Sequence, residues 1–408
     1  MKILHTADWH LGKRLEKFSR LEEQREVLEE IIQIADVNDV DAVLIAGDLF
    51  DNFNPSNEAV ELFYRTLKQL SNNGKRVVVA IAGNHDSPDR IEAPDPLARE
   101  CGILFLGYPH SVISSCELES GVCVVQSEAG FIELKLPKHE AKLRLLLTPY
   151  ANEYRLKTFL GVDGTDDELR QVLEHRWKEL ADKYCDDKGV NVLVSHLFMI
   201  KKGETPPEEP EDEKPILHVG GAQVIYSENI PPQIQYTALG HLHRYQVIDH
   251  KPCPVVYSSS PLSYSFSEAG QQKFVVLLDI EPGTPAQYSK IALTKGRKLQ
   301  RKSFDDMDKA LHWLQENQES LVELTLVTNQ YLRSEDRKRL LQAHDGIITI
   351  IPELKNLEQL GGAPTQSIDL NQGIENLFKQ YFQHRHGQEA NAELLELFKE
   401  VRAEQNEE

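Results

Sequence analysis

The sequence predicts an α/β fold of mixed sheets flanked by helices, followed by a small α+β capping domain and C-terminal helices. Two observations predict it. Short runs rich in Val, Ile and Leu, of strand length, recur along the earlier part of the chain, and amphipathic helical segments separate the first of them. Continuous apolar runs suit strands buried on both faces, and their alternation with helices is typical of a sheet covered by helices.

Each of these strand-like runs stops at a small cluster of Asp, Asn or His. The five runs lead into Asp8-Trp9-His10, Gly47-Asp48, Gly83-Asn84-His85-Asp86, Ser195-His196 and Gly240-His241-Leu242-His243. Because the functional groups of an α/β sheet gather outside the carboxyl ends of its strands, we expect these clusters to lie close together.

Two helices are predicted between the first three runs. Ser19 and Glu22 have the spacing of a capping box, and apolar residues between Val27 and Ala35 form a single helical stripe. A second apolar helix face runs over residues 62–70. The alternation of strand and helix therefore extends through the first three runs.

The polar clusters indicate a metal site. A single Asp or His after a strand is commonly a cap or a turn residue, but five such endings in this order are hard to explain by capping. Imidazole, carboxylate and amide groups without thiolate suit Mn²⁺, Fe or Zn²⁺. Their number suits two ions that share a carboxylate, an arrangement that hydrolyses phosphate esters. The candidate ligands are Asp8, His10, Asp48, Asn84, His196, His241 and His243.

These motifs resemble the calcineurin-like metallophosphoesterase superfamily. The segments Leu4-His5-Thr6-Ala7-Asp8-Trp9-His10-Leu11-Gly12 and Ala46-Gly47-Asp48-Leu49-Phe50-Asp51 are similar, within it, to the SbcCD-type nucleases of double-strand-break repair. The resemblance implies a sandwich of mixed sheets with two Mn²⁺ ions per chain. It implies one ion held by Asp8, His10, Asp48 and His243, and a second held by Asp48, Asn84, His196 and His241.

The resemblance also implies roles for other residues near the ligands. His85 would face the scissile phosphate and protonate the leaving oxygen or stabilise developing charge, and Asp86 would orient His85. Asp51 stands where some relatives have a histidine, so no direct catalytic role is expected for it. His5 lies within the first strand, and we expect it to be a hydrogen-bonded core histidine.

The activity implied by the resemblance is that of an ATP-regulated DNA nuclease. It would act as a Mn²⁺-dependent 3′→5′ exonuclease on duplex ends and as an endonuclease on single strands and hairpins. Its partner would be an SbcC-type coiled-coil ATPase subunit, with a homodimer of nuclease chains inside a heterotetramer. Two alternatives are a phosphoesterase of the same fold acting on nucleotides or other small phosphoesters, and a scaffold that anchors the ATPase. The form Asp8-Trp9-His10-Leu11-Gly12 disfavours the first, and the complete ligand set disfavours the second.

Three domains are predicted. Residues 1–275 form the nuclease domain, 276–360 a capping domain, and 361–408 a linker with docking helices. Two helical apolar faces, Ile374 to Phe382 and Leu394 to Val401, favour docking on the ATPase over packing on their own domain. The Pro- and Glu-rich segment 203–215 is interpreted as a surface insertion rather than a gate. The strands expected in the capping domain lie near 287–294, 298–304, 321–327 and 346–351, and its helices near 306–317 and 335–344.

Composition adds constraints on location and charge. The 408 residues carry a net charge of −20, which argues against coating nucleic acid. More than half of that excess lies in 204–213 and 389–408, whereas residues 1–20 are locally basic. Five cysteines without a Cys-x-x-Cys pair indicate free thiols. The chain has no apolar stretch typical of a secretory signal or a membrane span, so a soluble cytoplasmic protein without membrane association is expected.

Overall fold

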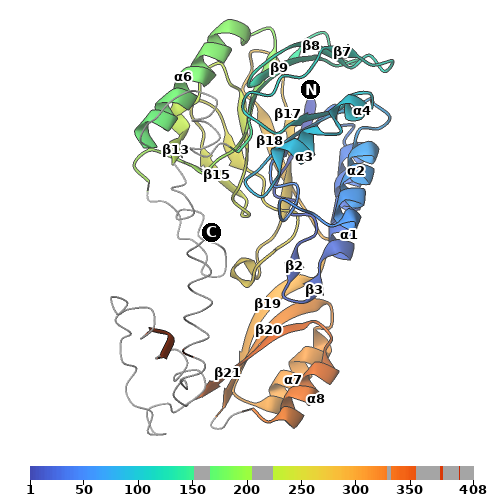
Figure 1. The fold of residues 1–408 in the computed structure, drawn as a ribbon, viewed down its shortest axis with the longest axis vertical. Coiled ribbons are helices and arrows are strands. Elements are labelled where there is room, and N and C mark those ends of the chain that lie inside the picture. The colour runs from blue at the N-terminus through green and yellow to red at the C-terminus, as the bar shows by residue number, and fades with distance from the viewer. Residues whose placement is uncertain (151–165, 205–223, 329–331, 355–376, 380–394, 396–408) are drawn as a thin grey trace. The chain divides into compact units, whose positions relative to one another are not determined.

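The computed structural model describes most of the chain (Figure 1). The described residues are 1–150, 166–204, 224–328, 332–354, 377–379 and 395. Most of the predicted terminal helices and most of the predicted loop at 203–215 therefore lie outside the described residues. The chain divides into two units, and the fold below is that of the first, Met1–Val327 with Leu332–Glu353. The second unit comprises Thr328–Tyr331 and Leu354–Glu408.

Two sheets form the body of the first unit. One has six strands in the order β18-β17-β1-β4-β5-β6, and the other has eight in the order β15-β16-β14-β11-β10-β9-β8-β7. In the first sheet β1 (Lys2–Thr6), β4 (Ala42–Ala46), β5 (Val77–Ile81) and β6 (Ile103–Leu106) are parallel, and β17 (Phe274–Asp279) and β18 (Gln287–Ala292) are antiparallel additions. The second sheet comprises β7 (Cys116–Glu117), β8 (Cys123–Glu128), β9 (Phe131–Lys135), β10 (Leu143–Thr148), β11 (Val190–His196), β14 (Tyr236–Gly240), β15 (Gln246–Asp249) and β16 (Val255–Tyr257).

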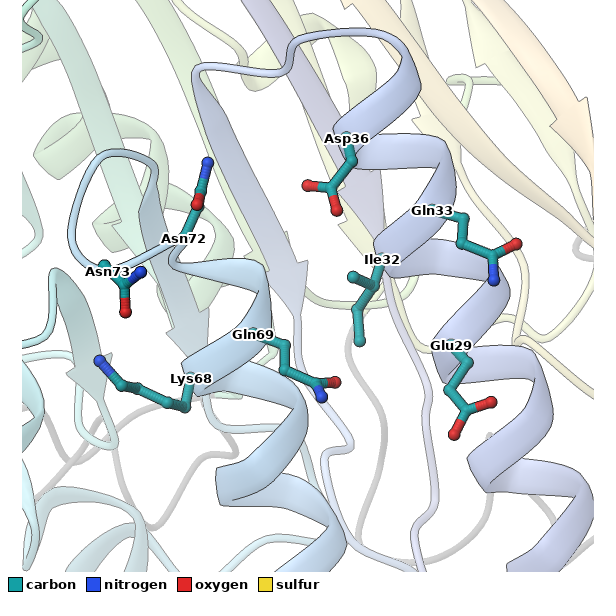
Figure 2. A pocket seen from close by; sticks show the side chains of 8 residues that line it. All are labelled: Glu29, Ile32, Gln33, Asp36, Lys68, Gln69, Asn72 and Asn73. Atoms are coloured by element: carbon teal, nitrogen blue, oxygen red, sulfur yellow. The ribbon is translucent and has the colours of Figure 1, made fainter.

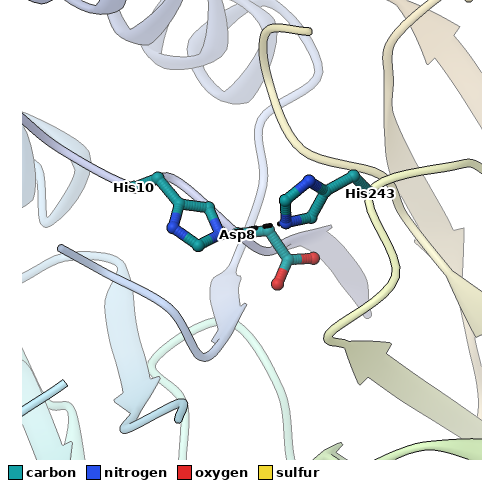
Figure 3. Close-up of side chains that lie close together, drawn as sticks. All are labelled: Asp8, His10 and His243. Atoms are coloured by element: carbon teal, nitrogen blue, oxygen red, sulfur yellow. Dashed lines mark hydrogen bonds between the residues drawn. The ribbon is translucent and has the colours of Figure 1, made fainter. Parts of the chain in front are cut away.

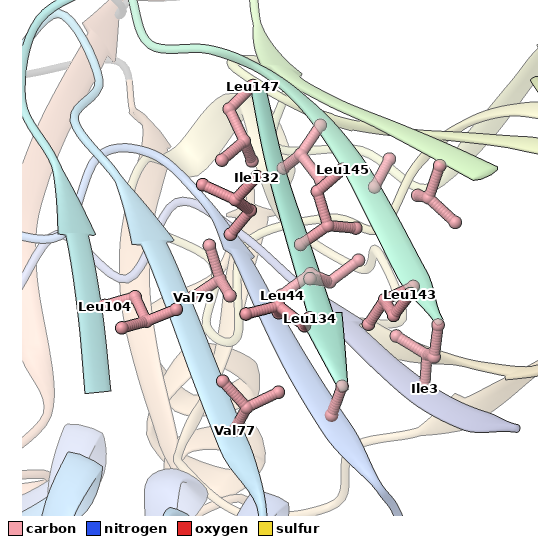
Figure 4. Close-up of a cluster of buried hydrophobic side chains, with 14 of the residues drawn as sticks. Ile3, Leu44, Val77, Val79, Leu104, Ile132, Leu134, Leu143, Leu145 and Leu147 are labelled. Atoms are coloured by element: carbon pink, nitrogen blue, oxygen red, sulfur yellow. The ribbon is translucent and has the colours of Figure 1, made fainter. Parts of the chain in front are cut away.

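The two sheets pack face to face around a buried apolar core (Figure 4). Leu44 and Val79 of the first sheet meet Ile132 and Leu145 of the second in this core. Alternate residues of β4 point the other way: Val43 packs under the helices that cover the outer face. The continuous apolar runs of the sequence are explained by this burial on both faces.

Helices cover the outer faces of both sheets. α1 (Leu21–Val37) and α2 (Asn57–Leu70) pack on the first sheet, and α6 (Asp166–Tyr184) packs on the second through residues such as Trp177. The predicted apolar stripe of α1 is buried as expected. The predicted capping box is wrong, because Arg20 occupies the N-cap position and Ser19 Oγ accepts the N–H of Leu21 rather than that of Glu22.

A groove separates α1 and α2 on their outer side (Figure 2). It is open, has a volume of about 530 Å³, and is lined mainly by polar side chains. Its lining includes Glu29 and Asp36 from α1 and Lys68 from α2, and none of the predicted site residues.

A smaller three-stranded sheet with two helices follows the sandwich. β19 (Lys298–Phe304), β20 (Ser320–Thr328) and β21 (Ile347–Leu354) pack with α7 (Met307–Glu316) and α8 (Ser334–Ala343) around their own core. The assignment of the strand near 287–294 to this unit is wrong. That strand is β18, which pairs with β17 in the six-stranded sheet because Tyr288 and Ile291 complete the two cores of the sandwich.

Short elements connect these layers. They are β2 (Arg14–Leu15), β3 (Phe18–Ser19), α3 (Pro88–Glu92), α4 (Asp95–Arg99), β12 (Met199–Ile200), β13 (Ile225–Tyr226), and the 3₁₀ turns η1 (Ser227–Asn229) and η2 (Phe266–Glu268). Within the described ranges, no helix has both the length and the apolar character needed to cross a membrane.

Candidate metal centre

The predicted ligands lie at or just beyond the carboxyl ends of β1, β4, β5, β11 and β14. Asp8, His10, Asp48 and His241 have φ angles of 55°, 44°, 50° and 107°, a region that costs free energy for residues other than glycine. Backbone bonds hold two of these turns together, since the Asp8 N–H donates to the Gly47 oxygen at 3.0 Å and the His10 N–H to the Asp48 oxygen at 2.9 Å. The strain is therefore concentrated where the predicted ligands converge.

Two glycines of the motifs are required by close packing at these turns. A Cβ on Gly83 would collide with the carboxylate of Asp48, and one on Gly240 would collide with the carbonyl oxygen of Ala46. The loops after β4, β5 and β14 can approach one another only because these two positions lack a side chain.

The first group of donor atoms comes from Asp8, His10, Asp48 and His243. Figure 3 shows His10 and His243 beside Asp8, with their Nε2 atoms directed toward each other. These two atoms lie 3.0 Å apart, and the ring planes are at 70°. His10 Nε2 also lies 3.5 Å from Asp48 Oδ2. All four side chains are buried or nearly so.

The second group comes from Asp48, Asn84, His196 and His241. Asn84 Oδ1 lies 2.9 Å from His196 Nε2 and 3.0 Å from His241 Nδ1. His196 Nε2 lies 3.4 Å from Asp48 Oδ2. A single oxygen of Asp48 is thus shared by the two groups, which we call the first and second subsites.

The ring nitrogens of two histidines are fixed by their outer hydrogen bonds. Nδ1 of His196 lies 2.8 Å from the Ala46 oxygen, and Nδ1 of His243 lies 3.4 Å from a carboxylate oxygen of Glu268. A carbonyl oxygen or a carboxylate can only accept, so each Nδ1 carries a hydrogen and Nε2 is the ring nitrogen that lies in the subsite.

This donor set fits divalent metal ions. Donors that bind one ion at about 2.1 Å stand roughly 3.0–3.4 Å apart, which is close to the separations within both subsites. Oδ2 of Asp8 is buried and has no hydrogen-bond partner within the described part of the chain, so an oxygen lone pair is left for a cation. Nitrogen and oxygen donors without sulfur are the set that transition metals such as Mn²⁺ or Zn²⁺ accept.

Burial and neighbouring charges shift the pKa values of the cluster residues in different directions when no ion is bound. Burial raises the pKa of Asp8 to about 6. Burial also disfavours a charge on Asp48, but His196 and His10 hold the pKa of Asp48 well below its usual range. Burial lowers the pKa of His241 to about 3, so this imidazole is neutral and free to act as a ligand.

His85 lies beside the first subsite, and the backbone of Asp51 fixes its ring. Its ring stands edge-on to that of His10, with 4.8 Å between centroids, and its Nδ1–H donates to the Asp51 carbonyl oxygen at 2.8 Å. Nε2 is then the ring nitrogen left for a substrate. The backbone N–H of His85 donates to Asp48 Oδ1 at 2.9 Å.

The carboxylate of Asp86 binds the backbone of the neighbouring loops, and its role in orienting His85 stays a prediction. It accepts the N–H groups of Gly83, Leu49 and Phe50 at 2.8, 3.0 and 2.9 Å. Burial, with Asp48 nearby, raises the pKa of Asp86 to about 6. Asp86 therefore fixes the two loops that carry Asp48 and Asn84.

His5 is a core histidine, as predicted. It is fully buried, and its two ring nitrogens lie 3.1 Å from the Tyr236 hydroxyl and 3.1 Å from the Leu239 oxygen. These contacts join β1 to β14 beneath the cluster.

Several residues that support the site were not predicted from the sequence. Gln24 on α1 donates to the His10 oxygen at 2.7 Å and accepts from the Gly12 N–H at 3.0 Å, which fixes the loop after β1. The sequence feature that could have indicated this role is the position of Gln24, a polar residue on the same face of α1 as the apolar stripe. Glu268 and Lys273 form a buried ion pair beside His243, and no local pattern marked them.

The fold and the cluster define a class of protein. A family model described as calcineurin-like phosphoesterase matches residues 1–245. Among solved structures, a dimetal phosphatase from Danio rerio has a TM-score of 0.38 at 12% identity, over 72% of this chain and 99% of that chain. A likeness this weak adds nothing to the assignment, which stands on the family model.

Two curated relatives narrow the class. The SbcD subunit of the nuclease SbcCD from Bacillus subtilis (strain 168) is 36% identical over 406 residues, which covers 98% of this chain and 97% of that protein. The protein of the same name from Rhodobacter capsulatus is 33% identical over 291 residues, or 71% of this chain and 68% of that protein. The chain therefore belongs to the SbcD family of calcineurin-like phosphoesterases, which makes it a nuclease subunit and a metal-dependent phosphodiesterase.

Proposed function

We propose that the chain is the Mn²⁺-dependent nuclease subunit of an SbcCD-type complex and that it cleaves DNA phosphodiesters with two metal ions. It acts as an ATP-regulated 3′→5′ exonuclease on duplex ends and as an endonuclease on single strands and hairpins, in DNA repair, replication and recombination. The observation that carries the proposal is the pair of adjacent donor groups that share Oδ2 of Asp48.

Each subsite has a defined ligand set in this proposal. When bound, two ions would supply the charge that clamps the phosphate, lowers the pKa of a water and neutralises charge in an in-line displacement. The chain holds the donors ready, since backbone bonds and strained turns fix the loops before any ion arrives. The first subsite uses Asp8, His10, Asp48 and His243, and the second uses Asp48, Asn84, His196 and His241.

His85 acts on the substrate through Nε2. Its Nδ1–H is held by the Asp51 carbonyl oxygen, so the ring keeps one orientation and Nε2 delivers a proton or a hydrogen bond to the phosphate or the leaving oxygen. Asp51 contributes its backbone oxygen here, while its carboxylate pairs with Lys13 at 2.9 Å. Asp86 supports the step indirectly by holding the backbone around Asp48 and Asn84.

The proposed partner is an SbcC-type coiled-coil ATPase, with two nuclease chains in a cytoplasmic heterotetramer. Both relatives are named as one subunit of the nuclease SbcCD, which supports a multisubunit assembly. The net charge of −20 also supports it, because an acidic subunit gains from a partner that helps to hold DNA.

The test is a nuclease assay of the chain alone and of the chain co-expressed with the ATPase. A labelled duplex and a labelled hairpin are incubated with Mn²⁺, with and without ATP. We expect cleavage by the wild type and a loss of about 10²- to 10⁴-fold in His85→Ala, the usual contribution of a positioned acid. His312→Ala is the matched control and should cleave normally, because this exposed histidine lies on α7 in the unit formed by β19–β21, α7 and α8, which we call the capping unit.

Two outcomes would contradict the proposal. If the wild type leaves both DNAs intact and hydrolyses a small phosphodiester, the chain is a small-substrate phosphoesterase. If His85→Ala keeps full nuclease activity, the catalytic assignment of His85 is wrong while the nuclease function stands.

A further inference from the structure

A segment beyond the seven candidate ligands lies directly against the first subsite. The ring of Tyr264 faces the rings of His10 and His243, with centroid separations of 5.5 and 6.1 Å. Four residues later, Oε1 of Glu268 lies 3.4 Å from Nδ1 of His243. Glu268 is only 3% exposed, so this carboxylate is a buried part of the site rather than a surface group.

The carboxylate of Glu268 is itself held in place. Its Oε1 accepts the backbone N–H groups of Tyr264 and Ser265 at 2.9 and 3.2 Å. Its Oε2 pairs with the ammonium group of Lys273, which is also buried. A buried charge pair persists only where further hydrogen bonds satisfy both partners, and this one is satisfied on both sides.

Lys273 also contacts the loop that carries His243. Its Nζ donates to the backbone oxygen of His243 at 2.8 Å and to Ser260 Oγ at 3.0 Å. The buried pair therefore contacts His243 twice: Glu268 contacts its ring and Lys273 its backbone oxygen. Nε2 of the His243 ring then lies toward His10 Nε2.

The same turn touches the capping unit. Phe266 on η2 packs with Leu299 and Leu321 of the capping unit and with Leu15 of the β2–β3 hairpin. Phe266 is two residues before Glu268. The short η2 turn therefore places one side chain, Phe266, against the capping unit and another, Glu268, against the candidate ligand His243.

We propose that Glu268 is a positioning residue for the first metal subsite and that the η2 turn links this subsite to the capping unit. Histidines that bind metals commonly donate their second ring N–H to a carboxylate, and loss of such a partner lowers metal affinity by about 10- to 100-fold. The inference rests on the proposed two-metal function and adds the group that holds one of its ligands.

The test measures Mn²⁺ binding to the full-length chain by electron paramagnetic resonance of free Mn²⁺. The wild type should bind two ions per chain. Glu268→Gln should keep one ion bound as tightly as before and weaken the other by about 10- to 100-fold. Glu133→Gln is the matched control, because Glu133 is a comparably buried carboxylate paired with Lys142 and Arg144 in the sheet. The Glu133→Gln variant should bind two Mn²⁺ ions as tightly as the wild type.

Glu268→Gln leaves Lys273 charged and unpaired, so a second variant guards against misfolding. Glu268→Gln combined with Lys273→Met removes both charges and should show the same weakening of one ion with a wild-type circular dichroism spectrum. Unchanged affinity for both ions in the double variant would overturn the positioning role. Fewer than two ions in the wild type would overturn the two-metal function, and this inference with it.

The link to the capping unit has its own readout. Phe266→Ala should weaken one ion by about 2- to 30-fold, the range seen for residues that couple distant sites. Phe304→Ala makes the same chemical change at the edge of the capping unit's own core and should leave both affinities unchanged. Equal Mn²⁺ affinities for Phe266→Ala and the wild type would overturn the link.

Discussion

The substitution His5→Gln should make the protein less sensitive to acid. His5 is fully buried between the sheets, and burial lowers its pKa to about 3 although the bond to the Leu239 oxygen raises it. The glutamine amide can still donate to the Leu239 oxygen and accept from the Tyr236 hydroxyl, so both contacts survive without a titrating group.

The sign and size of the effect follow from proton binding. Below the ordinary histidine pKa of about 6.5 the unfolded chain binds a proton that the folded chain refuses, so stability falls as pH falls from about 6.5 towards 3. At pH 5 the difference amounts to about 2 kcal/mol relative to pH 8. The wild type should lose this much more free energy of unfolding than His5→Gln between these two pH values.

The assay is urea denaturation of the chelator-treated protein at pH 8 and pH 5, so that bound metal does not contribute. The difference in free energy of unfolding between the wild type and His5→Gln is measured at each pH. His312→Gln is the control, because this exposed histidine should show no such difference. The reasoning is refuted if the difference between wild type and His5→Gln changes by less than about 0.5 kcal/mol between the two pH values.

Three further predictions concern the site and its support. The first is Asp48→Asn: the His85 N–H needs an acceptor at Oδ1, so the amide oxygen takes that position and the amide NH₂ takes the shared Oδ2 position. Mn²⁺ binding should then be lost at both subsites, and a titration that still finds two tightly bound ions would contradict this. Gly83→Ala should push the Asp48 carboxylate aside and weaken both ions more than tenfold in the same titration, and normal affinity would show that the loop can yield. The third is Gln24→Leu, which leaves the His10 oxygen and the Gly12 N–H without this partner. The free energy of unfolding measured in urea should fall by about 2–3 kcal/mol, and a fall of less than about 0.5 kcal/mol would count against the prediction.

The convergence of the seven candidate ligands was predictable because it depends on a local pattern. Each ligand follows or ends a buried strand, and parallel strands bring their carboxyl ends to one edge. The core role of His5 was predictable for the same reason, since a residue inside a doubly buried strand must find its partners there. Local order along the chain was enough to bring the seven side chains together, whereas their division between two subsites was implied by the family resemblance.

Features that depend on distant partners were not predictable in this way. The sequence of β18 predicts a short strand but does not indicate which sheet it joins. Its pairing with β17 in the structure places it in the sandwich. Asp86 adjoins His85 in sequence, yet three backbone N–H groups brought in by the fold take its carboxylate. α1 begins at Leu21 with Arg20 as its N-cap, and the buried Arg20 guanidinium bonds to the distant Ser263 as well as to Glu23.

The acidity of the chain and a site for phosphate esters are compatible once the charges are placed. The cluster contributes two buried carboxylates, Asp8 and Asp48, and burial keeps the His241 imidazole neutral. Burial lowers the pKa of His196, but Asp48 raises it to about 9, so this charge is balanced by the carboxylates and the polypeptide offers little net positive charge to a phosphate there. Two divalent ions would reverse the sign of that surface locally, while the acidic remainder of the chain continues to repel DNA. Attraction confined to the metals favours the scissile phosphate over the rest of the backbone, and this is why a separate partner that holds DNA is consistent with the charge of this subunit.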